Sequence, residues 1–177
     1  MKKILFVVLF VFLLAGCGSS EAPVNVWDSI SLDFMEMTID KIEIRDELTV
    51  KHTTGNANSS SSVSIGLSSA NGVTYVMMRG KITNKSNSVL PAKNIKSNIS
   101  VDGKETNGHI FLAYDDATYA DDLGAGKTAT YAIYIPIDEA VANSYSKVVV
   151  KFGFNDNFAS ASSVSSCKYK YSLTANR

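Results

Sequence analysis

The sequence has no excess of charge of either sign. Its 17 basic residues balance 17 acidic residues, so the formal net charge is 0. Removal of residues 1–16, a segment considered below, takes away Lys2 and Lys3 and leaves a net charge of −2. Proteins that bind nucleic acids present a basic patch or stripe. The even balance therefore indicates that nucleic acid is not a partner.

Histidine is scarce as well, since the chain contains only His52 and His109. A zinc site needs three or four protein ligands at close spacing, and a hydrolytic triad needs a histidine beside a poised serine. Neither histidine belongs to such a cluster, and the Gly-x-Ser-x-Gly pattern of many hydrolases is absent. The sequence therefore predicts a protein that is not an enzyme and holds no cofactor.

The long apolar runs are confined to the N-terminus. Met1-Lys2-Lys3 is followed by the uninterrupted apolar stretch Ile4–Leu14 and then by Leu14-Ala15-Gly16-Cys17. A basic start with about ten apolar residues is a signal peptide, and it is too short for a transmembrane helix of about 20 residues. Small residues directly before a cysteine form a lipobox, in which the thiol of Cys17 accepts diacylglycerol. An ordinary signal peptide that ends near a cysteine by chance is the alternative.

Lipid on Cys17 fixes the expected location and domain plan. Two or three acyl chains hold a protein stably on a membrane where one chain does not, so we expect a lipid anchor on the extracytoplasmic face. Residues 1–16 are then the signal peptide, and residues 17–30, with small polar residues and Pro23, are the lipidated N-terminus and a flexible tether. Residues 31–177 are expected to form one domain, long enough for a core without disulfides.

Cysteine is nearly absent, and this decides how Cys167 is interpreted. With Cys17 modified, Cys167 has no partner for an intramolecular disulfide. A lone thiol in an exported protein can be reactive or pair with another molecule. It can also pack in the core as a small apolar side chain, which is the interpretation we favour.

The chain also lacks helical periodicity. No segment between residues 30 and 177 shows a sustained 3.6-residue apolar stripe, and only Asp138–Tyr145 is expected to form a helical turn. Apolar and polar residues instead alternate in short runs, which is typical of antiparallel sheets with one face in the core. The expected strands are 35–39, 42–44, 73–84, 95–101, 109–114, 127–137, 147–154 and 167–173.

Two details of this alternation carry structural predictions. The apolar phase slips by one residue between Ile39 and Ile42, and such a slip turns the buried face over, so a β-bulge is expected near Asp40. Residues 55–72 are rich in Gly, Asn and Ser and are expected to form a long hairpin loop, with a short strand at Val63–Leu67. Asp102-Gly103 predicts a tight hairpin turn.

Three features in order resemble a known family. They are the strands leading into Ile82-Thr83-Asn84-Lys85-Ser86, the segment Leu123-Gly124-Ala125-Gly126-Lys127-Thr128, and the strand Tyr131–Pro136. Together they resemble the immunoglobulin-like domain of unknown function in Gram-positive lipoproteins, which is similar to a mycobacterial secreted immunogenic β-sandwich protein. Ala125 departs from the family's usual proline. The resemblance implies an all-β, immunoglobulin-like antiparallel β-sandwich of about seven or eight strands, with no catalytic residues to transfer.

Two motifs have residue types that could carry chemistry. Gly126-Lys127-Thr128 is not a P-loop, because position 121 is aspartate and a strand is expected to follow. Four carboxylates in one loop could ligate calcium, which takes oxygen donors, although the EF-hand spacing is absent and a solvated acidic loop is the favoured interpretation. These carboxylates are Asp115, Asp116, Asp121 and Asp122.

Aromatic residues could form a contact patch, because they dominate binding surfaces as well as cores. The candidates are Trp27, Phe34, Tyr114 and Tyr119, of which Phe34 is assigned to the core and Trp27 to no role. Asn-x-Ser triplets begin at Asn58, Asn84 and Asn98 and are interpreted as chance.

The expected function is therefore a lipid-anchored, non-enzymatic binding or interaction module whose ligand is a protein, a cell-wall glycan or a small molecule. Its displayed loops would carry the binding. The alternative is a structural or envelope-stress lipoprotein that associates with itself or contacts the cell wall through exposed β-edges.

Overall fold

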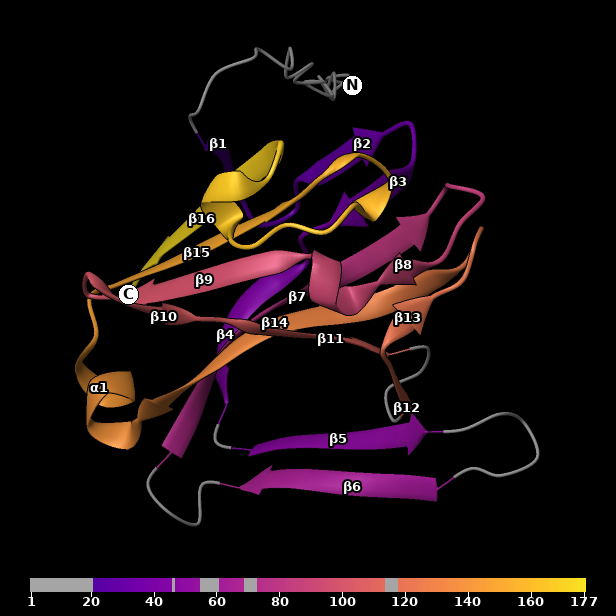
Figure 1. Cartoon of the computed structure of the whole chain (residues 1–177). Helices are drawn as coiled ribbons and strands as arrows, with labels where there is room; N and C mark the ends of the chain where they lie inside the picture. Colours follow the sequence, from indigo (N-terminus) through magenta and orange to yellow (C-terminus); the bar gives the residue numbers. More distant parts are fainter. Residues whose placement is uncertain (1–20, 46, 55–60, 69–72, 114–117) are drawn as a thin grey trace, which may run out of the picture.

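Two β-sheets pack face to face around one hydrophobic core (Figure 1). The computed structural model describes residues 21–45, 47–54, 61–68, 73–113 and 118–177. Side chains within 47–54, 61–68 and 118–120, and those of 73, 111 and 113, are outside this description. The predicted all-β class is confirmed.

The first sheet has five strands in the order β1-β16-β15-β9-β10. Their bounds are β1 Ala22–Val24, β16 Tyr169–Asn176, β15 Lys147–Phe154, β9 Lys96–Val101 and β10 Lys104–Asn107. All neighbours are antiparallel except β1 and β16, which run parallel.

The second sheet has nine strands in the order β2-β3-β7-β14-β11-β12-β5-β6, with β4 also paired to β7. Their bounds are β2 Ser29–Leu32, β3 Met35–Thr38, β4 Lys41–Arg45, β5 Glu47–Thr54, β6 Ser61–Ser68, β7 Val73–Asn84, β11 His109–Ala113, β12 Thr118–Ala120 and β14 Thr128–Asp138. A separate pair joins β8 (Leu90–Pro91) to β13 (Asp122–Leu123). The helices are α1 Glu139–Ser144 and single 3-10 turns at Ala92–Asn94, Asp156–Phe158 and Val164–Ser166.

The core follows from the period-two pattern of the long central strands. Tyr131 and Ile133 of β14 and Val150 and Phe152 of β15 are completely buried on the facing sides of the two sheets. Burial of each such side chain contributes about 1.5–3 kcal/mol. The predicted strands of these segments are confirmed, as are the helical turn at α1 and the turn at Asp102-Gly103 between β9 and β10.

The predicted bulge near Asp40 is present. β3 pairs Met37 with Ile82, and β4 pairs Lys41 with Arg79. Three residues between Met37 and Lys41 therefore face only two residues of β7, which is the two-against-one count of a β-bulge. The bulge divides one run of residues paired with β7 into β3 and β4. The structure has more strands than the seven or eight predicted mainly because further strands, such as β1, β2, β5 and β10, lie outside the predicted segments.

The bulge is locked from both sides. Its Thr38 carbonyl accepts a hydrogen bond of 2.9 Å from the hydroxyl of Tyr131, which is fully buried. A Cβ atom on Gly80 would lie only 1.9 Å from the same carbonyl oxygen, so no larger residue fits there. Burial, with a smaller effect of the Asp40 carboxylate, raises the pKa of Tyr131 far above its ordinary value. The phenol therefore remains a hydrogen-bond donor.

The predicted tether is wrong from Ala22 onward. Ala22 pairs with Tyr171 as the first residue of β1, and Val24 is buried in the core. Before it, the Glu21 carboxylate lies 3.4 Å from the Lys151 ammonium group. The described part of the domain thus includes residues 21–30, which the prediction placed before it. Alternation over three residues that include Pro23 is too short a signal to reveal such a strand.

The segment predicted as a long hairpin loop contains more strand than expected. β6 spans Ser61–Ser68 and pairs along its whole length with β5. Residues 55–60 and 69–72 lie outside the described residues. The β5–β6 hairpin lies along one side of the molecule, at the bottom of Figure 1, and joins the sheet through two residue pairs between β12 and β5.

Gly80→Ala should lower the free energy of unfolding by about 3 kcal/mol or more, because the new methyl group overlaps a fixed backbone carbonyl. Urea unfolding followed by circular dichroism measures the change. Gly124→Ala is the matched control, since its Cβ would meet its nearest neighbour at 3.6 Å, and we expect a change within about 0.5 kcal/mol. Equal stability of the two variants would contradict the proposed lock.

Candidate functional site

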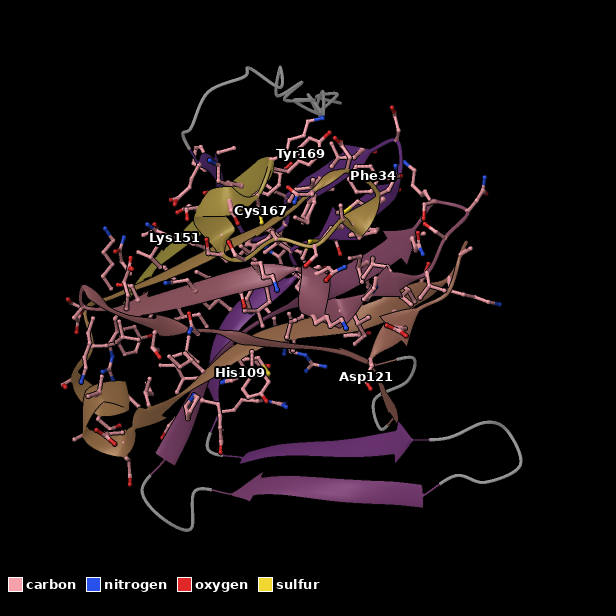
Figure 2. All side chains as sticks on the ribbon, in the orientation of Figure 1. Phe34, His109, Asp121, Lys151, Cys167 and Tyr169 are labelled. Carbon is pink, nitrogen blue, oxygen red and sulfur yellow. The ribbon has the colours of Figure 1, made fainter. Side chains whose placement is uncertain are left out.

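Three loops from both sheets meet at one end of the sandwich and line an open groove of about 850 Å³. We call it the loop groove. It is lined by residues 31–34 around the β2–β3 turn, 85–88 after β7, 156–157 after β15, and Tyr169 at the start of β16. Phe34 and Tyr169 lie side by side there in Figure 2.

Two lining residues of the loop groove, Phe34 and Tyr169, belong to an aromatic cluster that continues into the core. The rings of Phe34 and Phe158 meet edge to face with centroids 5.1 Å apart, and Phe34 and Tyr169 lie 5.8 Å apart. Phe154 adds a third neighbour, 5.8 Å from Tyr169. Such aromatic pairs add about 0.5–1.5 kcal/mol each beyond their buried area. Phe34 is almost completely buried, so its predicted place in the core is confirmed.

One wall of the loop groove has a strained backbone. Asn157 and Phe158 have φ angles of 47° and 56°, in the left-handed region that a bulky residue rarely adopts. Asparagine adopts this region more readily than other residues, so the strain lies mainly at Phe158, where it costs about 1–3 kcal/mol and persists only because the surroundings impose it. Here the Phe158 ring is buried, and its carbonyl accepts a 2.7 Å hydrogen bond from the Asn94 amide. The packing thereby fixes Asp156 and Asn157 at the groove.

A charged cluster adjoins the same wall. The Asp156 carboxylate accepts hydrogen bonds from the Lys168 ammonium group at 2.6 Å and the Tyr169 hydroxyl at 2.7 Å. These bonds hold the pKa of Asp156 below its ordinary value, and the bond to Asp156 raises the pKa of Lys168. Burial first, and then the bond to Asp156, raise the pKa of Tyr169. At neutral pH the groove therefore presents an ionised carboxylate, with Lys85 and Asp33 on the other walls.

Asn84 links two motifs of the sequence, Ile82–Ser86 and Leu123–Thr128. Its buried amide nitrogen donates to the carbonyls of Ser88, at 2.7 Å, and Leu123, at 3.0 Å. Its backbone N–H donates to the Lys127 carbonyl, and its own carbonyl accepts from the Gly126 N–H. These hydrogen bonds hold the loop that carries Lys85. The side-chain amide of Asn84, which begins one of the Asn-x-Ser triplets, is completely buried.

A second groove of about 620 Å³ runs beside the β9–β10 edge, and we call it the edge groove. His109 lies in it with its ring centroid 5.5 Å from that of Tyr134. Lys151 is 3.7 Å from the Glu105 carboxylate. Two buried atoms here, the Ser97 hydroxyl and the Asn98 amide oxygen, have no hydrogen-bond partner within the described residues.

The acidic residues predicted as a possible calcium site are only partly described. Asp121 and Asp122 are exposed, and the backbone around them pairs with β8: the Asp121 carbonyl accepts from the Ala92 N–H, and Asp122 lies opposite Pro91. Asp115 and Asp116 lie outside the described residues. Within the described part of the chain, no three His, Cys, Asp or Glu side chains are grouped to hold a metal ion.

Other predicted residues are scattered. Trp27 is 83% exposed in the turn between β1 and β2 and lines neither groove. His52 and Tyr119 face each other as backbone partners of β5 and β12, and their side chains are not described. Cys17, Asn58 and Tyr114 lie outside the described residues. Asn98 lies in β9.

The Gly126-Lys127-Thr128 segment is a turn that leads into a strand. Gly126 has a φ of 68°, the Lys127 N–H donates to the Gly124 carbonyl, and β14 begins at Thr128. A P-loop leads into a helix whose N-terminus faces the phosphate. The structure therefore agrees with the rejection of a phosphate-binding loop.

Sequence reasoning missed the residues of the loop groove. Asp156, Lys168 and Tyr169 were not selected because the groove is assembled from loops far apart in the chain. The one local signal was Asp156-Asn157, a pair typical of turns. Nothing in the sequence shows which turns of a sandwich share an end.

Comparison with solved structures shows the fold. An uncharacterized β-sandwich protein from Clostridium difficile 630 superimposes with a TM-score of 0.64 at 17% identity, over 90% of this chain and 97% of that one. A conserved hypothetical protein from Bacillus anthracis has a TM-score of 0.42 at 9% identity, over 72% of this chain and 88% of that one. A candidate lipoprotein from Bacillus subtilis has a TM-score of 0.41 at 8% identity, over 89% of this chain and 39% of that one.

No family model matches the sequence, and no curated protein matches it either. In the described part of the chain, no helix has the length and apolar character needed to span a bilayer. What the comparisons establish is an all-β sandwich similar to the Clostridium difficile protein.

Cys167 should be unreactive in the folded protein. It is 4% exposed, its thiol donates to the Ser163 carbonyl at 3.4 Å, and burial raises its pKa. In a Cys17→Ser background, a maleimide should label Cys167 slowly in buffer and rapidly in urea, because the thiolate is the reactive form. The control replaces Cys167 with serine and adds Ser165→Cys at an exposed neighbouring position. Its new cysteine should be labelled rapidly in the folded protein. Rapid labelling of folded Cys167 would contradict its assignment to the core.

Proposed function

We propose that the chain is a lipid-anchored extracytoplasmic protein that binds a ligand without catalysing a reaction. The anchor rests on the lipobox Leu14-Ala15-Gly16-Cys17. The binding role rests on one observation: loops from both sheets meet at a groove whose wall has a strained backbone fixed by packing. Backbone strain of this kind is concentrated at functional sites, and rigid scaffolds commonly carry binding residues on loops.

The chemistry of the loop groove favours a hydroxylated, polar ligand, and we propose a cell-wall glycan. Hydroxyl and amide groups of Ser31, Ser88 and Asn87 supply donors and acceptors together. The lining carries the carboxylates of Asp33 and Asp156 and the ammonium group of Lys85, and Asp156 is already paired with Lys168. Because charges of both signs are present, a strongly charged ligand of either sign would meet repulsion as well as attraction there. The exposed part of the Tyr169 ring offers an apolar surface for the non-polar face of a sugar ring.

We propose further that the sandwich is of the immunoglobulin-like type found in Gram-positive lipoproteins. Two of the motifs that carry this resemblance meet through the hydrogen bonds of Asn84 to Leu123 and Lys127. This contact gives the motifs a structural reason to occur together.

The proposed anchor would keep the loop groove close to the membrane. Ala22 follows Cys17 by five residue steps, which span at most about 17 Å when fully extended. Ala22 pairs with Tyr171, two residues from the Tyr169 side chain that lines the groove. A glycan bound there would therefore lie next to the bilayer rather than at the outer surface of the envelope.

Cys17→Ala should move the protein from the membrane fraction to the soluble extracytoplasmic fraction, because it removes the atom that accepts the lipid. Fractionation followed by immunoblotting measures this. Cys167→Ala, which also removes a thiol, should stay with the membrane. Persistence of the Cys17→Ala variant in the membrane pellet would refute the proposed anchor.

Replacement of two exposed groove residues, Lys85→Ala with Asn87→Ala, should abolish co-sedimentation with purified cell-wall sacculi while leaving unfolding by urea nearly unchanged. Both side chains are exposed, so their removal costs within about 0.5 kcal/mol of stability. Lys104→Ala, an exposed lysine on β10, is the control and should bind as the native protein does. If the native protein does not sediment with sacculi, or the double variant still does, the glycan proposal is wrong.

A further inference from the structure

The strands at the ends of the sheets differ in how they are protected from pairing with another chain. An uncovered edge presents unpaired N–H and C=O groups, and proteins discourage pairing there with charge, proline or short length. β10 carries Lys104 and Glu105, and β1 has only three residues, one of which is Pro23. β2 has only four residues, and β4 carries three charged residues in five.

β6 has none of these protections. It is the last strand of the nine-stranded sheet and pairs only with β5 among the described strands. It has eight residues, Ser61-Ser62-Val63-Ser64-Ile65-Gly66-Leu67-Ser68, with no charge and no proline. Every residue of the strand is matched to one of β5, so the strand runs without a bulge along its whole length. Such an edge is a template for strand addition.

The sequence of β6 is symmetric about Ile65. Apolar residues occupy positions 63, 65 and 67, and Ser or Gly occupies 62, 64, 66 and 68. If two β6 strands run antiparallel around a two-fold axis at Ile65, Val63 lies opposite Leu67 and Ile65 lies opposite itself. Because successive positions of a strand alternate between the two faces of a sheet, positions 63, 65 and 67 of both strands then fall on one face. If the register shifts by one residue, the strands remain antiparallel but Val63 lies opposite Gly66. Apolar positions are then no longer opposite apolar positions.

We propose that β6 is a dimerisation edge, at which two copies of this chain join their nine-stranded sheets in antiparallel register around Ile65. The interface is isologous, as most homodimer interfaces are. This inference does not rest on the proposed glycan site, because the loop groove and β6 have no residue in common. Anchoring of both copies to one membrane would favour the pairing further by raising their effective concentration.

A charge introduced at position 65, which lies on the proposed two-fold axis, provides the test. Two full-length chains with different C-terminal tags are co-expressed, solubilised in detergent and purified through one tag. Native chains should co-purify. When both copies carry Ile65→Lys, or both carry Ile65→Glu, co-purification should be lost because like charges lie directly opposite each other.

The mixed pair distinguishes a broken contact from a misfolded chain. Ile65→Lys in one copy and Ile65→Glu in the other should restore co-purification, which no unfolded variant can do. Thr106→Lys in both copies places the same charge on the edge strand β10 and should leave co-purification intact. Native chains that do not co-purify, like-charge pairs that still do, or a mixed pair that is not rescued would each overturn the proposal.

A cysteine pair fixes the register. With Cys17 and Cys167 replaced by serine, Ile65→Cys should give a disulfide-linked dimer on oxidation, because the two residues face each other across the axis. Val63→Cys should not, since two copies of residue 63 lie roughly 14 Å apart in this register and a disulfide needs Cα atoms within about 7 Å. Cross-linking at 63 but not at 65 would rule out the register.

Discussion

The hydrogen bond from the Tyr131 hydroxyl to the Thr38 carbonyl controls the edge of the larger sheet. It holds the extra residue of the bulge against Gly80, and thereby lets β3 and β4 pair with the same strand in registers that differ by one residue. The bulge also holds the turn between β1 and β2. Ile39 accepts from the Trp27 N–H and donates to the Asp28 carbonyl, so the turn before β2 depends on the same residues.

The loop groove shows how the core limits the shape of the surface. Phe158 adopts a left-handed backbone because its ring is held among Phe34 and Phe154. The aromatic cluster stabilises the domain, and the same contacts hold Asp156 where Lys168 and Tyr169 reach it. The wall of the groove and one end of the core are therefore a single packing unit, and a change in one disturbs the other.

The sequence predicts what is local and fails where contacts are distant. β14 and β15 were found because each repeats the period-two pattern over eight or more residues, and β7 because it is rich in strand-forming residues. The bulge was found because the alternation changes phase near Asp40. β1 was missed because only its pairing with β16 makes it a strand. Asp156 and Tyr169 meet Lys85 only after both sheets have formed, so no local signal marks them as one site.

The parallel pairing of β1 with β16 has a consequence for how the chain is made. The first described strand of the domain takes its hydrogen bonds from the last one, so the smaller sheet is incomplete until residues 169–176 have been synthesised. Contacts between the ends of a chain are slow to form, because a long loop must close first. In the export proposed above, the chain would emerge N-terminus first and remain incompletely folded through its passage. Truncation near the C-terminus would expose the apolar face around Val24 at the opposite end of the sequence.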